Sequence, residues 1–407
     1  MKYWNALLAT LLTGGICFAQ TNQTAVVGDF KPSSVNQPDK QYPQVNSEGR
    51  VRVSISAPQA LKVQFDIGAV KYDLKKDDKG VWTGECAPQD EGFHYYQLWV
   101  DGAAVPDPSS LYFYGASRWG SGIEIPAKDQ DFYALKNVPH GQLRENHYFS
   151  KSTNAVRRCF VYTPPGYDEK TNSRYPVLYL QHGMGENESG WGYQGRTGLV
   201  MDNLIAEGKT KPFIIVMDNS SVTFPAGARP GMAPRRPGTA DSASRADTSQ
   251  ARRGGFGNFN FAAQFEKILI EELIPYIDAN FRTLSDQPHR AMAGLSMGGM
   301  QTRQITLAHL DKFSHIGIFS GGSISMEDVN KAARFKEKVK LVFVSFGSRE
   351  LENRRPGGPF GGDPKENSAA LKEAGINSQF YVSPLTAHEW QSWRRSLHEF
   401  APLLFKD

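Results

Sequence analysis

The first third of the chain alternates between apolar and polar residues, which is the pattern of strands with one buried face. The alternation begins at residues 51–55 and repeats at residues 61–67. Residues 93–100 form an aromatic-rich run that is closed by an Asp-Gly pair, a combination typical of hairpin turns. Because several short strands are separated by turns and no helical periodicity intervenes, residues 46–126 are predicted to form a small antiparallel β-sandwich.

The pattern changes after residues 127–142, which are predicted to be a linker. Short apolar runs now alternate with stretches whose apolar residues lie three or four positions apart, the longest being residues 262–281. Buried strands alternating with amphipathic helices indicate a mostly parallel sheet with helices on both faces. Residues 143–407 are therefore predicted to be an α/β domain, whose strands are expected at residues 159–162, 177–180, 213–217, 290–293, 316–319, 341–346 and 379–382.

The N-terminus has the organisation of an export signal. A lysine precedes an apolar stretch at residues 6–16, and a small-x-small cleavage site, Cys-Phe-Ala, follows. The apolar stretch is shorter than the roughly 20 residues that span a bilayer, so we expect no stable membrane insertion. Lipidation of Cys17 is an alternative that the bulky Ile16 disfavours. We therefore expect a signal peptide at residues 1–19, a polar leader at residues 20–45 and a secreted or periplasmic protein.

Charge and cysteine content narrow the class of protein. The formal net charge is +4, and residues 221–258 carry six arginines against two aspartates, which accounts for the whole excess. A broad nucleic-acid-binding face is therefore not expected. We expect Cys86 and Cys159 to be buried free thiols in different domains. No His/Cys pattern has the spacing of a metal site.

Two loop insertions follow predicted strands. Residues 221–258 are rich in Arg, Gly, Pro and Ser, and residues 354–363 form a second Gly/Pro cluster. Loops at the carboxyl ends of parallel strands line the ligand crevice. We expect these loops either to border a site or, as such a composition often does, to be flexible surface loops.

Residues 290–301, RAMAGLSMGGMQ, contain the main candidate for chemistry. Gly294-Leu295-Ser296-Met297-Gly298 fits the G-x-S-x-G pattern between a predicted strand and a predicted helix. A serine at such a turn needs small neighbours, and the N-terminus of the following helix favours developing negative charge. The alternative is an ordinary glycine-rich loop. The position between strand and helix favours Ser296 as a nucleophile.

A nucleophilic serine needs a base and an acid, which in this architecture follow it in the order Ser, acid, His. His388 follows the last predicted strand in a loop, whereas the other candidates fall within predicted helices or at the start of a strand: His309, His315 and His398. Glu350 follows the preceding strand and is the favoured acid, with Glu352 and Asp363 as competitors. Its role would be to hold the tautomer of the histidine and to stabilise the imidazolium.

Two backbone N–H groups are expected to bind the oxyanion. One belongs to Met297, the residue after the serine. The other should lie in the HGMG segment that follows the strand at residues 177–180, where Met184 is favoured and Gly183 is the alternative. Glycines let backbone N–H groups approach a ligand closely, although a plain turn at a strand end would have the same composition.

These segments resemble the esterase-D-like branch of the α/β-hydrolases. Within it they are similar to the family-one carbohydrate esterases, the feruloyl and acetylxylan esterases of plant-cell-wall degradation. The matching segments run from about residue 157 to the C-terminus: YPVLYLQHGMGENESGW, LIPYIDANF, RAMAGLSMGGMQ, FGSRE and TAHEWQSWRRSL. The sandwich, with DEGFHYYQLWVDG and DPSSLYFYG, resembles the Ig-like module attached to such esterases, which is related to starch- and glycogen-binding modules.

The resemblance implies an α/β-hydrolase fold preceded by an Ig-like sandwich. It also implies a nucleophile at Ser296, a histidine at His388 and an acid at Glu350, with oxyanion donors at Met297 and residues 183–184. Many relatives carry Asp at the acid position, so Glu350 is a departure from the pattern. The Arg-rich insertion fits no part of it.

The function implied by the resemblance is that of a secreted serine esterase, which removes acetyl or feruloyl groups from xylan through an acyl-enzyme. No metal or cofactor is implied, and the partner is an acylated plant polysaccharide or oligosaccharide. Trp191 and Trp390 are expected near the site, where they would stack on a sugar or phenolic ring, or else to belong to the core.

Three alternative functions remain open at the level of sequence. A siderophore esterase also joins an Ig-like module to this fold, but the export signal disfavours it. A mycolyl-type acyltransferase shares the fold. A polysaccharide-binding protein with an inert hydrolase domain would not need a complete Ser, Glu and His set. The acyl group, a binding role for the sandwich and the oligomeric state are likewise open.

Overall fold

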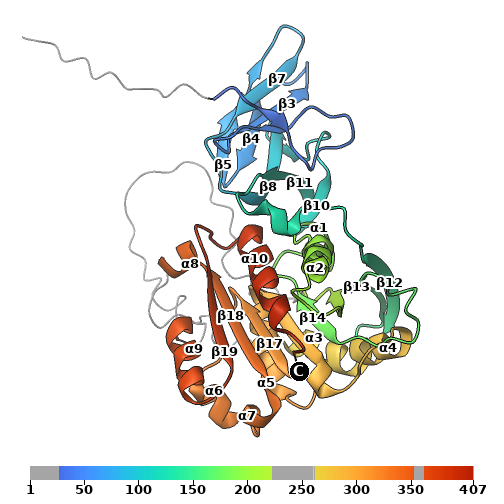
Figure 1. Ribbon diagram of the computed structural model, residues 1–407. Coiled ribbons are helices and arrows are strands. Elements are labelled where there is room, and N and C mark those ends of the chain that lie inside the picture. The colour runs from blue at the N-terminus through green and yellow to red at the C-terminus, as the bar shows by residue number, and fades with distance from the viewer. Residues whose placement is uncertain (1–26, 222–259, 261, 353–361, 407) are drawn as a thin grey trace, which may run out of the picture.

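The computed structural model describes residues 27–221, 260, 262–352 and 362–406. Figure 1 shows two small sheets from the N-terminal third (blue to teal) stacked against one end of a larger sheet with helices around it. The predicted signal peptide lies outside the described residues, as do nearly all of the Arg-rich insertion and most of the second Gly/Pro cluster. Within the described ranges, no helix combines the length and the apolar character needed to cross a bilayer.

The two small sheets are antiparallel and enclose an apolar core, as the alternating pattern predicts. Val53, Phe65 and Leu98 are fully buried between them. The first sheet has the order β1-β2-β3-β7-β6, formed by β1 (Lys31–Pro32), β2 (Gln44–Val45), β3 (Val51–Ser56), β7 (Val81–Glu85) and β6 (Lys75–Lys76). The second has the order β10-β11-β8-β4-β5, with β9 on β8, formed by β10 (Tyr112–Gly115), β11 (Arg118–Ile125), β8 (Gly92–Val100), β4 (Val63–Ile67), β5 (Val70–Asp73) and β9 (Ala103–Val105).

Part of the predicted leader belongs to the sandwich. β1 pairs with β2, and β2 pairs with β3. Val35 and Val45 are both buried. The prediction of a polar leader is therefore wrong for residues 31–45, because two isolated valines in a polar context gave no periodic signal. Residues 127–142, the predicted linker, contain one short 3₁₀ helix at Gln130–Tyr133.

The large sheet has eight strands, and the mostly parallel arrangement predicted from the sequence is confirmed. Its order is β12-β13-β15-β14-β16-β17-β18-β19. The β12–β13 and β13–β15 pairings are antiparallel, and every other pairing is parallel. The strands are β12 (Gln142–Ser150), β13 (Ala155–Thr163), β15 (Ile214–Asp218), β14 (Val177–Gln181), β16 (Arg290–Leu295), β17 (His315–Phe319), β18 (Leu341–Gly347) and β19 (Ser378–Ser383).

Helices cover both faces of this sheet. Alternate residues of β14 point to opposite sides, so Leu178 and Leu180 belong to one apolar cluster and Val177 and Tyr179 to another. One face is covered by α2 (Thr197–Ala206) and α10 (Trp390–Phe400). The other is covered by a long helix with a central π-turn, α3 (Ala263–Ile268), η3 (Leu269–Leu273) and α4 (Ile274–Asn280), and by α5 (Met297–Ala308), α6 (Met326–Lys331), α7 (Phe335–Lys338) and α9 (Pro364–Glu373).

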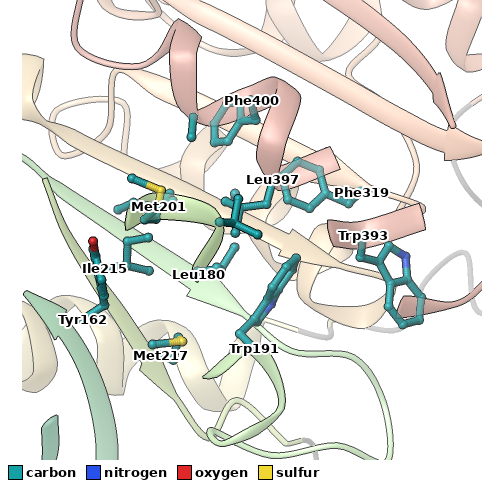
Figure 2. Close-up of a cluster of buried hydrophobic side chains, with 14 of the residues drawn as sticks. Tyr162, Leu180, Trp191, Met201, Ile215, Met217, Phe319, Trp393, Leu397 and Phe400 are labelled. Carbon is teal, nitrogen blue, oxygen red and sulfur yellow. The ribbon is translucent and has the colours of Figure 1, made fainter. Parts of the chain in front are cut away.

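The sandwich and the large sheet share one apolar cluster. Phe93 and Phe113 of the second small sheet pack in the same cluster as Trp191 and Trp390. Figure 2 shows part of this layer, with Trp191 and Phe319 close to the side chains of α10. Cys86 lies in the sandwich and Cys159 in β13, and both are buried free thiols as expected. The two parts are therefore packed together rather than merely tethered.

Candidate active site

Ser296 occupies a sharp turn between β16 and α5. Its φ of 52° is unusual for a residue with a side chain, and its backbone N–H donates to the Phe319 carbonyl at 2.8 Å. A Cβ on Gly298 would lie 2.6 Å from the His182 carbonyl oxygen, and one on Gly294 would lie 2.5 Å from the Gly298 backbone. The glycines of G-x-S-x-G are therefore required by the close approach of backbone segments around the serine.

The three residues predicted to act together form one hydrogen-bonded line. The Ser296 hydroxyl lies 2.9 Å from His388 Nε2. His388 Nδ1 lies 2.6 Å from Glu350 Oε1. The carboxylate accepts at Nδ1, so Nε2 is left to accept the serine proton. The His388 side chain is 49% exposed and that of Glu350 is 13% exposed, so solvent reaches the histidine while the acid behind it is largely covered.

The carboxyl ends of three strands bring these residues together. Glu350 lies in α8 (Ser348–Glu352), which begins directly after β18, and His388 lies in the loop between β19 and α10. A Cβ on Gly347 would lie 2.4 Å from the Thr386 carbonyl oxygen. The backbone N–H of Arg349 also donates to that carbonyl at 3.0 Å. The turn that carries the acid therefore packs directly on the loop that carries the histidine.

Two further side chains hold the acid and the histidine, and sequence reasoning missed both. Ser320 donates to Glu350 Oε2 at 2.7 Å, and the Gly347 N–H donates to the same oxygen at 2.8 Å. Trp393 donates from its indole N–H to Ser320 Oγ at 3.1 Å. Its ring also meets the His388 imidazole edge-on, with centroids 5.1 Å apart. The available signal for Ser320 was its position directly after a predicted strand.

The competing acids and histidines have other structural partners. Asp363 caps the N-terminus of α9. Glu352 is the last residue of α8, and among the described residues it is Glu350, not Glu352, that bonds to His388. The three competing histidines pair elsewhere: His309 with Glu266, His398 with Glu399, and His315 with Ser314. Burial lowers the pKa of His315 to about 4.

The predicted oxyanion donors flank the serine. Met297 is the first residue of α5, where a backbone N–H has no acceptor within the helix. A Cβ on Gly183 would lie 3.4 Å from Ser296 Cβ, so the HGMG segment passes directly over the nucleophile. Met184 lies next in this turn and is partly exposed. The two segments can thus aim N–H groups at a carbonyl oxygen of an ester bonded to Ser296.

His182 fixes the start of the HGMG segment. Its Nδ1 lies 2.7 Å from the Gly183 carbonyl oxygen, and its Nε2 accepts from the Ser220 N–H at 2.9 Å. Burial lowers the pKa of His182, which favours the neutral ring that this pairing requires. The side chain thereby ties the loop after β14 to the loop after β15.

The sugar-stacking role predicted for two tryptophans is not supported. Trp191 is 1% exposed and Trp390 is 2% exposed. Their rings meet edge-on with centroids 5.5 Å apart, and the Trp390 ring meets that of Trp393 in the same way at 5.3 Å. Both tryptophans belong to the apolar layer beneath the site, where no sugar can reach their faces.

The part of the chain that the structure describes contains no cluster of side chains suited to bind a metal ion. No group of three or more His, Cys, Asp or Glu side chains there could hold a metal ion. The geometry around Ser296 is one that could supply a nucleophile, a base, an acid and a place for an oxyanion, the set of groups that acyl transfer uses.

Comparison with known sequences identifies relatives of this chain. An endo-1,4-beta-xylanase/feruloyl esterase from Xylanibacter ruminicola is 44% identical over 386 residues, which cover 93% of this chain and 48% of that protein. An endo-1,4-beta-xylanase Y from Acetivibrio thermocellus is 24% identical over 284 residues, covering 62% of this chain and 22% of that protein. The chain thus spans about half of the first relative's length and less of the second.

Solved structures share the fold. A ferulic acid esterase from Anaeromyces mucronatus, solved with ferulic acid, has a TM-score of 0.51 and 22% identity, covering 69% of this chain and 96% of that one. An enterobactin esterase from Shigella flexneri, solved in the presence of enterobactin, has a TM-score of 0.56 and 15% identity, covering 87% of this chain and 92% of that one. The α/β-hydrolase-like fold preceded by antiparallel sheets is thereby confirmed.

A family model matches the region that carries the candidate site. Residues 150–403 match the Esterase family, a range that extends from before β13 to beyond α10 and includes all three residues of the hydrogen-bonded line. From the extent of this match, the chain belongs to the Esterase family.

Proposed function

We propose that this protein is a secreted serine esterase that releases feruloyl or acetyl groups from xylan. The observation that carries the proposal is the continuous line from the Ser296 hydroxyl through His388 to Glu350, at 2.9 Å and 2.6 Å. The line ends at a strained turn whose neighbours can supply two oxyanion donors. These are the parts that ester hydrolysis through an acyl-enzyme requires.

The reaction follows from the positions of these groups. Ser296 Oγ attacks the ester carbonyl while His388 Nε2 takes the hydroxyl proton. The N–H groups of Met297 and of Met184 or Gly183 bind the oxyanion that forms. His388 then gives its proton to the departing sugar oxygen, which leaves an acyl group on Ser296. Water, deprotonated by His388, attacks this ester and releases the free acid together with the original serine.

The choice of substrate draws support from the relative of 44% identity, whose name joins a xylanase to a feruloyl esterase. The Esterase family match and the Ser296 line both favour the esterase activity of that pair for this chain. Ferulate and acetate are both esterified to xylan-type polymers, and the same acyl-enzyme chemistry removes either. Secretion would bring the enzyme to a polymer that does not enter cells, in keeping with the predicted export signal.

A substrate panel tests this proposal. Purified protein would be given methyl ferulate, feruloylated arabinoxylan, acetylated xylan and a catecholate trilactone, and the released acid would be measured. We expect release from at least one xylan-type ester and little from the trilactone. In Ser296→Ala, we expect kcat to fall by at least roughly 10⁴-fold. Hydrolysis of the trilactone alone would reassign the enzyme to siderophores, and full activity of Ser296→Ala would refute the mechanism.

A further inference from the structure

One hydroxyl of the sandwich reaches into the α/β part and is fully hydrogen-bonded there. Tyr95, on β8, accepts from Gln194 Nε2 at 2.7 Å and from Trp390 Nε1 at 3.2 Å. Its own proton faces Glu186 Oε1 at 3.1 Å, with the Tyr114 carbonyl oxygen further away at 3.4 Å. A phenol has two lone pairs and one proton, so this set of contacts uses all of its capacity.

Two of the partners of Tyr95 lie in the segments that carry the candidate chemistry. Glu186 is two residues after Met184, in the loop expected to supply the second oxyanion donor. Trp390 is two residues after His388 and begins α10. A single oxygen atom of the sandwich therefore joins the oxyanion loop to the segment that carries the base.

A second contact from the sandwich reaches the same loop. The tip of the β10–β11 hairpin, with Ala116 and Ser117 both at positive φ, donates from the Ser117 N–H to the Gly185 carbonyl at 2.7 Å. Gly185 has a φ of 79°, and a Cβ there would lie 3.3 Å from the Ser117 nitrogen. The residue directly after Met184 is thus held in a left-handed conformation against the hairpin.

Glu186 suits this contact because it is buried and its Oε1 receives a donor. Burial raises the pKa of Glu186 to about 8, so the carboxyl is mostly protonated at neutral pH and no counter-charge is needed beside it. In the folded protein its place is set by the Tyr95 hydroxyl and the surrounding aromatic layer rather than by an ion pair.

We propose that Tyr95 is a positioning residue for ester hydrolysis: through its hydroxyl, the sandwich holds the oxyanion loop and the His388 segment at their working separation. The sandwich is then a part of the catalytic unit. The inference rests on the proposed function, since it assigns Tyr95 to the geometry of that reaction. Displacements of about 1 Å in a reacting geometry are enough to lower rates by about 10²-fold.

The test compares two neighbouring tyrosines. Tyr95→Phe keeps the ring and removes only the bridging hydroxyl. Tyr96→Phe is the matched control, because Tyr96 is the next residue of the same strand and its buried hydroxyl bonds to Asp107 inside the sandwich at 2.8 Å. With 4-nitrophenyl acetate as substrate, we expect kcat to fall about 10- to 100-fold in Tyr95→Phe with KM within about twofold, and to stay near the wild-type value in Tyr96→Phe.

Hydrogen–deuterium exchange gives a readout that does not depend on turnover. Tyr95→Phe should speed exchange at residues 183–190 and 386–390, whereas Tyr96→Phe should leave both segments unchanged. If wild-type protein hydrolyses no ester, the proposed function fails, and the exchange data still report whether Tyr95 holds the two segments.

Two results would overturn the inference. One is a kcat for Tyr95→Phe within twofold of wild type, and the other is exchange at both segments that matches Tyr96→Phe. Should Tyr95→Phe not fold, Gln194→Met replaces it, since it removes one donor to the same oxygen. We expect the same direction of change in kcat and exchange, and unchanged values in that variant would count against the proposal equally.

Discussion

The interior of the large sheet and its junction with the sandwich are both buried, but they are built from different groups. Inside the sheet, Leu178 and Leu180 face one apolar layer and Val177 and Tyr179 the other, and all four are fully buried. At the junction, Arg394 of α10 donates to both oxygens of Glu124 on β11, at 2.6 Å and 3.0 Å. Its side chain is 0% exposed and that of Glu124 is 6% exposed.

The difference teaches how each region fixes geometry. Apolar packing is non-directional and depends on volume. A buried ion pair depends on direction and on the presence of both partners. Burial alone raises the pKa of Glu124, but the Arg394 charge and its hydrogen bonds outweigh this and leave the pKa below its usual value. The junction therefore specifies how the sandwich sits, while the sheet interior supplies bulk stability.

The largest loss of stability is expected when one partner of the Arg394–Glu124 ion pair is removed. Arg394→Met leaves the Glu124 carboxylate buried without its main partner and also removes the donor to the Gln194 carbonyl. We expect a loss of about 4 kcal/mol in the free energy of unfolding, measured by urea denaturation at pH 7. Adding Glu124→Gln to this variant should restore part of that loss, because the buried carboxylate that lost its main partner is then gone, and the charge left without that carboxylate, on Arg196, has a side chain that is 23% exposed. A double variant less stable than Arg394→Met would contradict the comparison.

Shortening a side chain in the sheet interior should lower the free energy of unfolding somewhat less, and it should leave the contacts at the junction unchanged. Leu180→Ala leaves a cavity in the layer shown in Figure 2, and we expect a loss of about 3 kcal/mol by the same denaturation method. Because this loss does not depend on charge, it should be the same at pH 5 and pH 8. A cost that changed strongly with pH would show that the sheet interior is not the apolar region described here.

The smallest effect concerns the buried carboxyl of the oxyanion loop. The pKa of Glu186 is about 8 in the folded protein against an ordinary value of 4.5. Between these values the folded state holds a proton that the unfolded state releases, so its contribution to stability is present below about pH 4.5 and is lost as the pH rises toward 8. Relative to Glu186→Gln, wild type should therefore lose about 1 kcal/mol between pH 6 and pH 7. Parallel stability curves for the two proteins would refute the buried, protonated state.

Local sequence signals were enough for most strands of the large sheet, although not for β12, and for the hydrogen-bonded line. Ser296 was marked by glycines that the backbone around it requires, and His388 and Glu350 each follow a strand whose end lies at the same edge of the sheet. The roles of these residues were inferred from chain order, and their distances agree with that order.

The contacts of the sandwich with the site could not be predicted in the same way. Tyr95 meets Glu186 and Trp390 across 91 and 295 positions of sequence, and no local pattern encodes such pairings. The burial of Trp390 did leave a signal, since residues 390, 393, 397 and 400 are spaced by three and four and so share one face of α10.

Covalent trapping of the nucleophile tests the central claim most directly. A fluorophosphonate forms a phosphorus–oxygen bond with an activated serine and loses fluoride, and trypsin would release residues 291–303 with Ser296 inside. Mass spectrometry should locate the adduct on Ser296 in the wild type and should find it largely lost in His388→Ala, since the base is then missing. Folded wild-type protein that carries no adduct on this peptide, or equal labelling without His388, would contradict the account.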